Sequence, residues 1–280
     1  MCVPLCQQKI AETMLNRRNF IKTVGAITAV AAAASLDQKA AASVNAAPQQ
    51  NISYSNVVDL THTLHPDFQT YSGEKQIDLK KVFSLKKDGY NLNGYNLSNE
   101  HVGTHMDAPF HFSDRDSADA IPAQNLVGAL AVIDITDKTR LNSDAQLTME
   151  DLKAWERKWG RIPDGAVVAM YSGWERYVNY PQFRNADSKG IMHFPGFHID
   201  AINYLLEMRS VKGIMVDTLS LDYGKSADFA VHYKWLPSNR WGIECAANLG
   251  KLPASGATVV VGGPKIAGAT GGPSRVLALV

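Results

Sequence analysis

The sequence is short of cysteine, of net charge and of long apolar runs. Its 280 residues include only three cysteines, Cys2, Cys6 and Cys245, and the formal net charge is +1. Such a balanced charge argues against nucleic acid as a partner, because it provides no basic surface. If Cys2 and Cys6 are lost with a leader segment, the remaining cysteine cannot form an internal disulfide. A chain of this length can instead be stabilised by its own apolar core.

An apolar stretch over residues 24–34 lies in a segment typical of an export signal. It follows Arg17-Arg18 and Phe20-Ile21-Lys22, a twin-arginine pattern, and it precedes small-residue cleavage sites at 40–42 and 44–47. An uncleaved membrane anchor is the alternative, but it needs roughly 20 apolar residues. We therefore expect residues 1–47 to be a cleaved twin-arginine signal peptide that is recognised by the twin-arginine export machinery. The mature protein would be periplasmic or secreted, with no stable membrane anchor.

The remaining residues, 48–280, contain no linker, repeat or charge run that divides them, so we expect a single catalytic domain. Apolar and polar residues alternate over 77–85 and 94–98, which predicts antiparallel strands. Continuous apolar runs predict buried strands at 129–135 and 166–171, and residues 213–217 are expected to be a strand that ends in an acid. Helices are expected from Thr148 onward, over 198–208 and over 244–249. This mixture predicts an α/β fold with one mixed central sheet.

Residues 101–112, HVGTHMDAPFHF, concentrate side chains that bind metals or transfer protons. His101, His105 and His111 lie there together with Asp107. Glycine and proline within the segment make a helix unfavourable. In an extended chain His105 and Asp107 are two residues apart, so their side chains point the same way. A single histidine is more often a surface or core residue, but this cluster predicts a metal site.

The residue types in this cluster suit metal-dependent hydrolysis. Imidazole and carboxylate ligands fit Zn, Mn, Fe or Co, and a bound divalent ion lowers the pKa of its water to about 7. When an amide is cleaved, the leaving nitrogen must receive a proton. A histidine that is close to the metal but not bound to it can carry that proton.

The complete pattern HxGTHxDxPxHF at 101–112 resembles that of the cyclase family of metal-dependent hydrolases, which includes bacterial kynurenine formamidases and isatin hydrolases. The resemblance covers roughly residues 57–280 and includes the distal pair His232 and Glu244, the stretch 217–222 and the closing segment 271–275. It implies a mixed-sheet fold similar to swivelling β/β/α domains, and a homo-oligomer. The implied reaction is cleavage of an amide-type C–N bond.

The resemblance also implies a role for each site residue. The implied metal ligands are His101, His105, Asp107, His232 and Glu244. Asp107 would bridge two ions and Glu244 would contact both, although a single tightly held ion is the alternative. His111 would be the catalytic proton shuttle. The cofactor would be one or two divalent ions, with Zn²⁺ expected first and Mn²⁺ as the alternative.

The substrate is left open by one departure from the formamidase pattern. An aromatic-Pro-Gly-Asp turn is replaced here by Tyr71-Ser72-Gly73-Glu74, where Tyr71 is a candidate to stack on an aromatic substrate. A small aryl formamide is the first expectation, and ring-opening of a cyclic imide or lactam such as isatin is the second. An exported metal- or ligand-binding protein without catalysis is the third.

Two further acids are candidates to orient a ligand histidine. Asp217 and Asp222 lie in the stretch 217–222, where a carboxylate could accept a hydrogen bond from an imidazole. An ordinary cap or turn is the alternative for each. Cys245, next to Glu244, is expected to be buried and not to act as a nucleophile.

Overall fold

The computed structural model describes residues 52–280, so the expected signal peptide over residues 1–47 lies outside the described part. The largest sheet contains, in chain order, β1 (Val57–Asp59), β4 (His105–Asp107), β5 (Val127–Asp134), β7 (Val167–Tyr171), β9 (Gly213–Val216), β10 (Trp241–Glu244), β11 (Ala257–Gly262), β12 (Gly271–Pro273) and β13 (Arg275–Leu279). These nine strands are ordered β1-β13-β11-β5-β7-β9-β10-β4-β12. The four central strands β5, β7, β9 and β10 are parallel to one another. On either side of them, β11 pairs antiparallel with β5, and β4 pairs antiparallel with β10. The expected α/β fold with one mixed central sheet is therefore confirmed.

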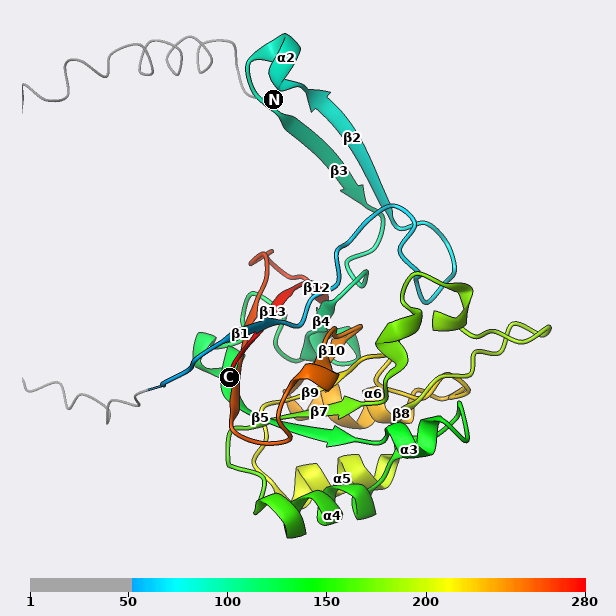
Figure 1. Cartoon of the computed structure of the whole chain (residues 1–280), viewed down its shortest axis with the longest axis vertical. Coiled ribbons are helices and arrows are strands. Elements are labelled where there is room, and N and C mark those ends of the chain that lie inside the picture. Colours follow the sequence, from blue (N-terminus) through cyan, green and yellow to red (C-terminus); the bar gives the residue numbers. More distant parts are fainter. Residues whose placement is uncertain (1–51) are drawn as a thin grey trace, which may run out of the picture. The chain divides into compact units, whose positions relative to one another are not determined.

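Helices α4 (Met149–Trp159) and α5 (Ile199–Met208) cover one face of this sheet (Figure 1). The other helices are α3 (Thr136–Thr139), α6 (Ala230–Trp235) and α2 (Leu85–Asp88), and α2 lies away from the sheet. The buried residues Leu152 of α4 and Ile202 of α5 belong to one apolar cluster with Val168 of β7. Helix α4 begins as expected, because the Asp151 carboxylate accepts a hydrogen bond from the Thr148 amide at 2.7 Å. The parallel strands are buried on both faces, which explains their continuous apolar sequences.

The sheet is curled, and its opposite face encloses a second apolar core. Met106 of β4, Ile243 of β10, Val259 of β11 and Ala278 of β13 share one buried cluster, although they come from different ends of the strand order. The curl therefore brings chain segments that are far apart in sequence around β4. Within residues 52–280, no helix is long and apolar enough to span a membrane.

Four shorter strands form two small sheets beside the main one. These are β2 (Ile77–Phe83) with β3 (Leu92–Leu97), which are antiparallel, and β6 (Gln146–Leu147) with β8 (Gly196–Phe197), which are parallel. The β2–β3 hairpin was expected from the alternating sequence, and it extends away from the main sheet (Figure 1). Leu79 and Tyr95 lie opposite each other on it and are 49% and 71% exposed. An apolar cross-strand pair is thus left open to solvent.

The helix expected over residues 244–249 is wrong. Trp241–Glu244 is the buried strand β10, which pairs with β9 on one side and β4 on the other. Cys245 then leaves the strand with a positive φ of 53°. Pairing of Glu244 with His105 of β4, and the isolated bridge between Ala246 and Thr61, hold this stretch in an extended chain instead of a helix.

Candidate active site

Strand β4 provides two of the predicted ligands, and its neighbour β10 provides a third. His105 and Asp107 are both buried and alternate with Met106, whose side chain belongs to the apolar core on the other face. The antiparallel register places Glu244 directly opposite His105. Residues directly opposite in an antiparallel pair have neighbouring side chains, so this register brings the distal glutamate to the metal-binding motif.

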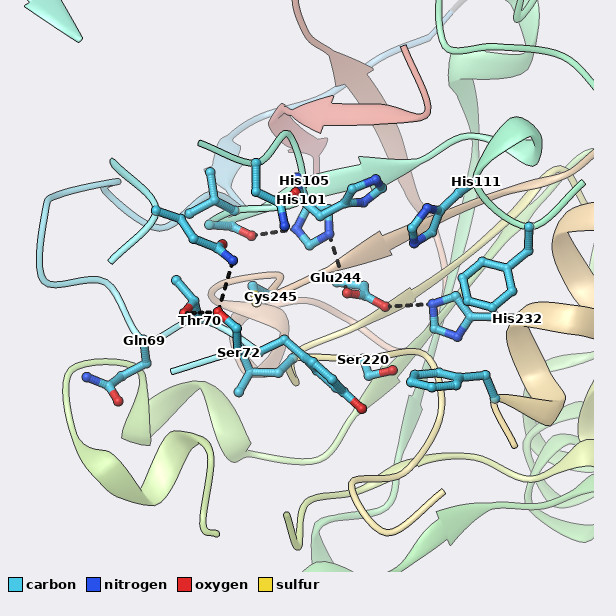
Figure 2. Close-up of a pocket in the computed structure, with 18 residues that line it drawn as sticks. Gln69, Thr70, Ser72, His101, His105, His111, Ser220, His232, Glu244 and Cys245 are labelled. Atoms are coloured by element: carbon cyan, nitrogen blue, oxygen red, sulfur yellow. Dashed lines mark hydrogen bonds and ion pairs between the residues drawn. The ribbon is translucent and has the colours of Figure 1, made fainter. Parts of the chain in front are cut away.

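The other candidates reach the same place from short segments around β4. His101 precedes the strand, and His111 lies in the 3-10 turn Pro109–His111 that follows it. His232 is a buried residue of α6. Figure 2 shows these histidines and Glu244 converging on one cavity. The structure therefore brings all six predicted metal and catalytic residues together, while their roles remain predictions.

Asp107 and Glu244 each turn one oxygen toward His105 and the other toward His232. His105 Nε2 lies 3.4 Å from Asp107 Oδ1 and 3.4 Å from Glu244 Oε2. His232 Nε2 lies 3.3 Å from Asp107 Oδ2 and 3.2 Å from Glu244 Oε1. Two ligands of one tetrahedral ion with bonds of about 2.1 Å are about 3.4 Å apart. The spacing therefore fits ligands that share an ion, and each carboxylate presents one oxygen to each of the two histidines.

The two buried histidines have their Nδ1 atoms committed elsewhere. Nδ1 of His105 is 2.8 Å from the Gly103 carbonyl, and Nδ1 of His232 is 2.6 Å from Asp222 Oδ2. Each Nδ1 must donate to these acceptors, which leaves the Nε2 lone pair free. Among the described residues, His105 Nε2 and Asp107 Oδ2 are buried without a hydrogen-bond partner. Unpartnered buried polar atoms are costly, so this donor set fits a bound cation.

The raised pKa values of His105 and His232 also indicate that positive charge is stabilised at this site. Burial lowers the pKa of His105, but the nearby carboxylates of Asp107 and Glu244 outweigh it and raise the pKa to about 10. For His232, too, the contacts with Asp107, Asp222 and Glu244 outweigh burial and hold the pKa well above its usual value. Two nearly inaccessible carboxylates therefore require compensation, which a divalent ion bound by neutral imidazoles would supply.

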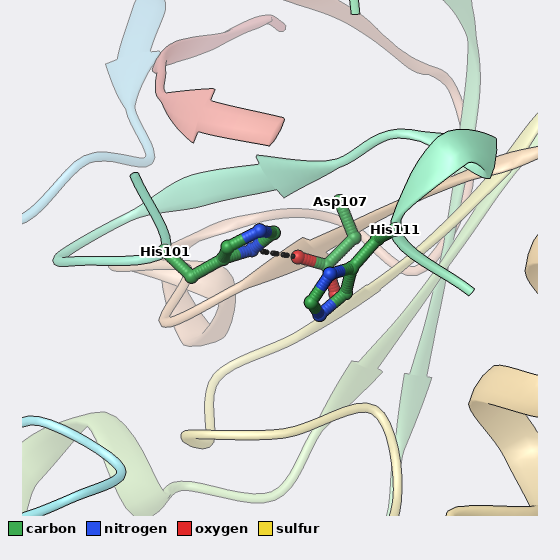
Figure 3. Close-up of side chains that lie close together, drawn as sticks. All are labelled: His101, Asp107 and His111. Carbon is green, nitrogen blue, oxygen red and sulfur yellow. Dashed lines mark hydrogen bonds and ion pairs between the residues drawn. The ribbon is translucent and has the colours of Figure 1, made fainter. Parts of the chain in front are cut away.

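His111 differs from the other histidines in its surroundings. Its ring stacks on that of His101, with centroids 3.9 Å apart and an interplanar angle of 25° (Figure 3). Burial lowers its pKa to about 4, and the nearby Asp107 only partly counteracts this. His111 is therefore neutral at physiological pH, and it can accept a proton beside the metal ligands without being fixed by them.

The cavity beside these residues has a volume of about 300 Å³ and is lined on one side by aromatic rings. Tyr71 lines it, as predicted, and its ring centroid is 6.1 Å from that of Phe229. Phe229 in turn lies 5.9 Å from Phe112. Polar groups also reach the cavity; they come from Thr70, Ser72, Gln76, Asn99 and Ser220. The volume and lining fit a small, flat molecule with an apolar ring and a few polar atoms.

Sequence reasoning did not find Phe229. Its backbone is left-handed, with φ of 49° and ψ of 41°, where a bulky side chain is rarely found, and it directly precedes α6. Strained residues of this kind are concentrated at functional sites. No motif in the sequence marks this phenylalanine, because only the backbone conformation distinguishes it.

The two candidate orienting acids have different roles. Asp222 accepts a hydrogen bond from His232 Nδ1 at 2.6 Å, so it orients a predicted ligand. Asp217 instead accepts from the Ser172 hydroxyl at 2.5 Å and from the Trp174 amide at 3.0 Å, and so ties the turn after β7 to the end of β9. Cys245 is buried as expected, and burial next to Glu244 raises the pKa of its thiol well above the usual value. A thiol of this kind is a poor nucleophile.

Comparisons with known proteins extend over most of the described chain. The model of the Cyclase family matches residues 58–223. An isatin hydrolase from Roseibium aggregatum is 34% identical over 228 residues, which are 78% of this chain and 85% of that protein. A kynurenine formamidase from Bacillus anthracis is 30% identical over 81 residues, only 29% of this chain and 39% of that protein.

A solved structure agrees with the sequence comparison. Isatin hydrolase A from Ralstonia solanacearum superposes with a TM-score of 0.76 and is 35% identical. The superposition covers 80% of this chain and 92% of that one. The two proteins therefore share the same overall fold over most of their length.

Proposed function

This chain belongs to the Cyclase family, and on that basis we propose that it is a metal-dependent hydrolase that opens an amide-type C–N bond in a small substrate. One observation carries the proposal. Asp107 and Glu244 each face both His105 and His232 at 3.2–3.4 Å, beside a cavity large enough for such a substrate. A binding protein without catalysis would have no use for the unfixed His111 at the edge of this group.

His101, His105, Asp107, His232 and Glu244 would hold the cofactor, and the bridging arrangement favours two ions over one. Their nitrogen and oxygen donors suit Zn²⁺, and Mn²⁺ is the alternative. A divalent ion at this place supplies an acidified water at neutral pH and polarises a carbonyl oxygen. The protein's own contribution is to orient each ligand, as Asp222 does for His232.

His111 would move the proton that the reaction requires. As water attacks the amide carbonyl carbon, neutral His111 accepts a proton from that water. As the C–N bond breaks, the same imidazolium donates the proton to the leaving nitrogen, which departs as an amine while the carbonyl carbon becomes a carboxylic acid. Burial keeps the pKa of His111 near 4, so the ring is ready to accept the proton at neutral pH.

The substrate would be a flat aromatic compound that packs against Tyr71 and Phe229. A cyclic lactam of the isatin type is favoured, because similarity to an isatin hydrolase extends over 78% of the chain. An aryl formamide is the second candidate, since the shorter similarity is to a kynurenine formamidase. Both reactions cleave the same kind of bond with the same groups.

The function is tested by measuring bound metal and hydrolysis together. The purified protein is analysed for its metal content and assayed with isatin and with N-formylkynurenine, before and after removal of metal by a chelator. We expect one or two equivalents of Zn²⁺ or Mn²⁺, and hydrolysis that disappears with the metal and returns when it is added back. Tight metal binding without hydrolysis of either probe, or of a broader amide and ester panel, would instead identify a binding protein.

We also propose that the chain is exported through the twin-arginine route and acts outside the cytoplasm. The support is the sequence around Arg17-Arg18 and the small residues at 40–47. Replacing both arginines by lysine should retain the protein in the cytoplasm, as followed by cell fractionation. Undiminished export of that variant would count against the route.

A homo-oligomer remains part of the proposal, with the β2–β3 hairpin as the contact to a second copy. An isolated two-stranded hairpin is only marginally stable in water, and Leu79 and Tyr95 leave its apolar pair uncovered. Light scattering after gel filtration should show a smaller species for Leu79→Asp and Tyr95→Asp. A Tyr180→Asp variant, at another exposed tyrosine, serves as the control and should keep the native size.

A further inference from the structure

The ring of His101 is held at both nitrogens by residues from distant parts of the chain. Its Nε2 lies 2.8 Å from the hydroxyl oxygen of Thr270, which directly precedes β12. Its Nδ1 lies 2.6 Å from Asp107 Oδ1 (Figure 3). Thr270 is bound in turn by Glu100, whose Oε1 accepts from the Thr270 amide at 2.9 Å and also from the Thr270 hydroxyl.

These contacts determine where the proton of His101 lies. A carboxylate can only accept hydrogen bonds, so the single hydroxyl proton of Thr270 points at Glu100. The hydroxyl oxygen then presents only lone pairs to His101, and Nε2 must be the protonated nitrogen that donates to it. In the neutral imidazole this leaves the lone pair on Nδ1, facing the acceptor Oδ1 of Asp107. At 2.6 Å the two atoms are at hydrogen-bond distance, closer than two ligands of one ion, so a bound cation would take the place of a proton between them.

We propose that Glu100 and Thr270 are positioning residues that fix the tautomer of His101, so that this histidine presents Nδ1 to the metal. This inference rests on the proposed metal-dependent function and adds two residues to it. His105 and His232 are fixed the opposite way, since their Nδ1 atoms donate to Gly103 and Asp222. His101 is thus oriented through Thr270, next to the edge strand β12, and through Glu100, which binds Thr270.

The local backbone supports this orientation of His101. Gly271 pairs with Asp107 in the β12–β4 register, and the Thr270 carbonyl accepts from the Ala108 amide at 2.9 Å. A Cβ added to Gly271 would lie 2.7 Å from His101 Cε1 and 2.2 Å from the Met106 carbonyl oxygen. Thr270 and Gly271 therefore pack closely against the His101 imidazole, and a side chain at residue 271 would displace that ring.

The test compares Thr270→Val, which keeps the shape but lacks the hydroxyl, with Thr270→Ser, which keeps the hydroxyl. The dissociation constant for Zn²⁺ is measured by chelator competition on the full, folded protein. We expect Thr270→Val to weaken Zn²⁺ binding by about 10- to 100-fold, as is typical for the loss of a residue that orients a metal ligand. Thr270→Ser should stay within about threefold of the wild type, on the same scale.

A matched control separates loss of orientation from loss of stability. Thr139→Val likewise removes a threonine hydroxyl, a buried one that donates to the Ser172 carbonyl at 2.8 Å, away from the site. We expect this variant to lose comparable thermal stability and no Zn²⁺ affinity. The inference is overturned if Thr270→Val binds Zn²⁺ as tightly as the wild type, or if Thr270→Ser is as weak as Thr270→Val.

A second measurement reports the tautomer directly. Long-range ¹H–¹⁵N spectra of Zn²⁺-loaded, histidine-labelled protein show which nitrogen of His101 carries the proton, with His101→Asn used for assignment. We expect Nε2–H in the wild type and a mixture of both tautomers in Thr270→Val. A wild-type ring protonated at Nδ1 alone would overturn the inference. A wild type that binds no Zn²⁺ and hydrolyses neither probe would refute the proposed function, independently of this result.

Discussion

Replacing His111 by asparagine should separate proton transfer from metal binding. The structure places this ring against His101 but gives it no hydrogen bond to any predicted ligand among the described residues. Loss of a stacked ring pair costs about 0.5–1.5 kcal/mol, which corresponds to less than about tenfold in metal affinity. Loss of a positioned acid–base group costs about 10²- to 10⁴-fold in turnover, or roughly 3–5 kcal/mol in the activation free energy. The variant should therefore keep its metal and lose its activity.

The assay follows initial rates of isatin hydrolysis over a range of substrate concentrations, which gives both kcat and kcat/KM, with metal content determined on the same sample. Because burial lowers the pKa of His111 to about 4, the wild type needs the neutral ring and should lose kcat/KM as the pH falls through that value. The asparagine variant should lack this acidic limb. Retention of more than about a tenth of the wild-type turnover by a fully metal-loaded variant would refute the assigned role.

The remaining predictions concern the ligands, the cavity wall and the stability of the domain. Asp107→Ala should lose both activity and bound metal, because both carboxylate oxygens face predicted ligands; metal analysis showing full occupancy would contradict this. Asp222→Ala should weaken Zn²⁺ binding by about 10- to 100-fold by leaving His232 without its acceptor, and equal affinity in chelator competition would count against that. Phe229→Asn should raise KM for aromatic substrates without loss of thermal stability, since asparagine tolerates a left-handed backbone; an unchanged KM would remove Phe229 from the substrate wall. For Glu156, burial raises the pKa, but the bonds from Arg209 and Tyr204 outweigh it and lower the pKa from 4.5 to about 2. Its stabilisation is therefore present above about pH 4.5 and is lost as the pH falls toward 2, so the difference in unfolding free energy between wild type and Glu156→Gln, about 1–3 kcal/mol at pH 7, should shrink over this range. Urea unfolding that gives the same difference at pH 3 and pH 7 would show that the carboxylate does not carry it.

Local sequence was sufficient for the features that depend on residues near one another. The alternation along 77–85 and 94–98 predicted the β2–β3 hairpin, and the apolar runs predicted the buried strands β5 and β7. The i,i+2 spacing of His105 and Asp107 placed both on one face of what proved to be β4. Such periodicity follows from backbone geometry alone, so it needs no knowledge of the rest of the molecule.

Residues that meet through the sheet could not be assigned in the same way. Glu244 was expected to begin a helix, yet it ends β10, because only pairing with β4 and β9 makes a buried strand favourable there. Asp217 and Asp222 were indistinguishable in sequence, but only the second accepts a hydrogen bond from His232. The family resemblance identified Glu244 and His232 as site residues. It did not explain how the fold brings them to the site.

The sequence by itself therefore determined which chemical groups are available: imidazoles and carboxylates in a short motif, with an acid–base histidine close behind. The tertiary structure alone decided how each group is presented. The antiparallel register of β4 and β10 sets Glu244 opposite His105, and the pairing of β12 with β4 sets Thr270 against His101. Both contacts join chain segments far apart in sequence, and their geometry depends on strand order and register, which no local pattern of residues encodes.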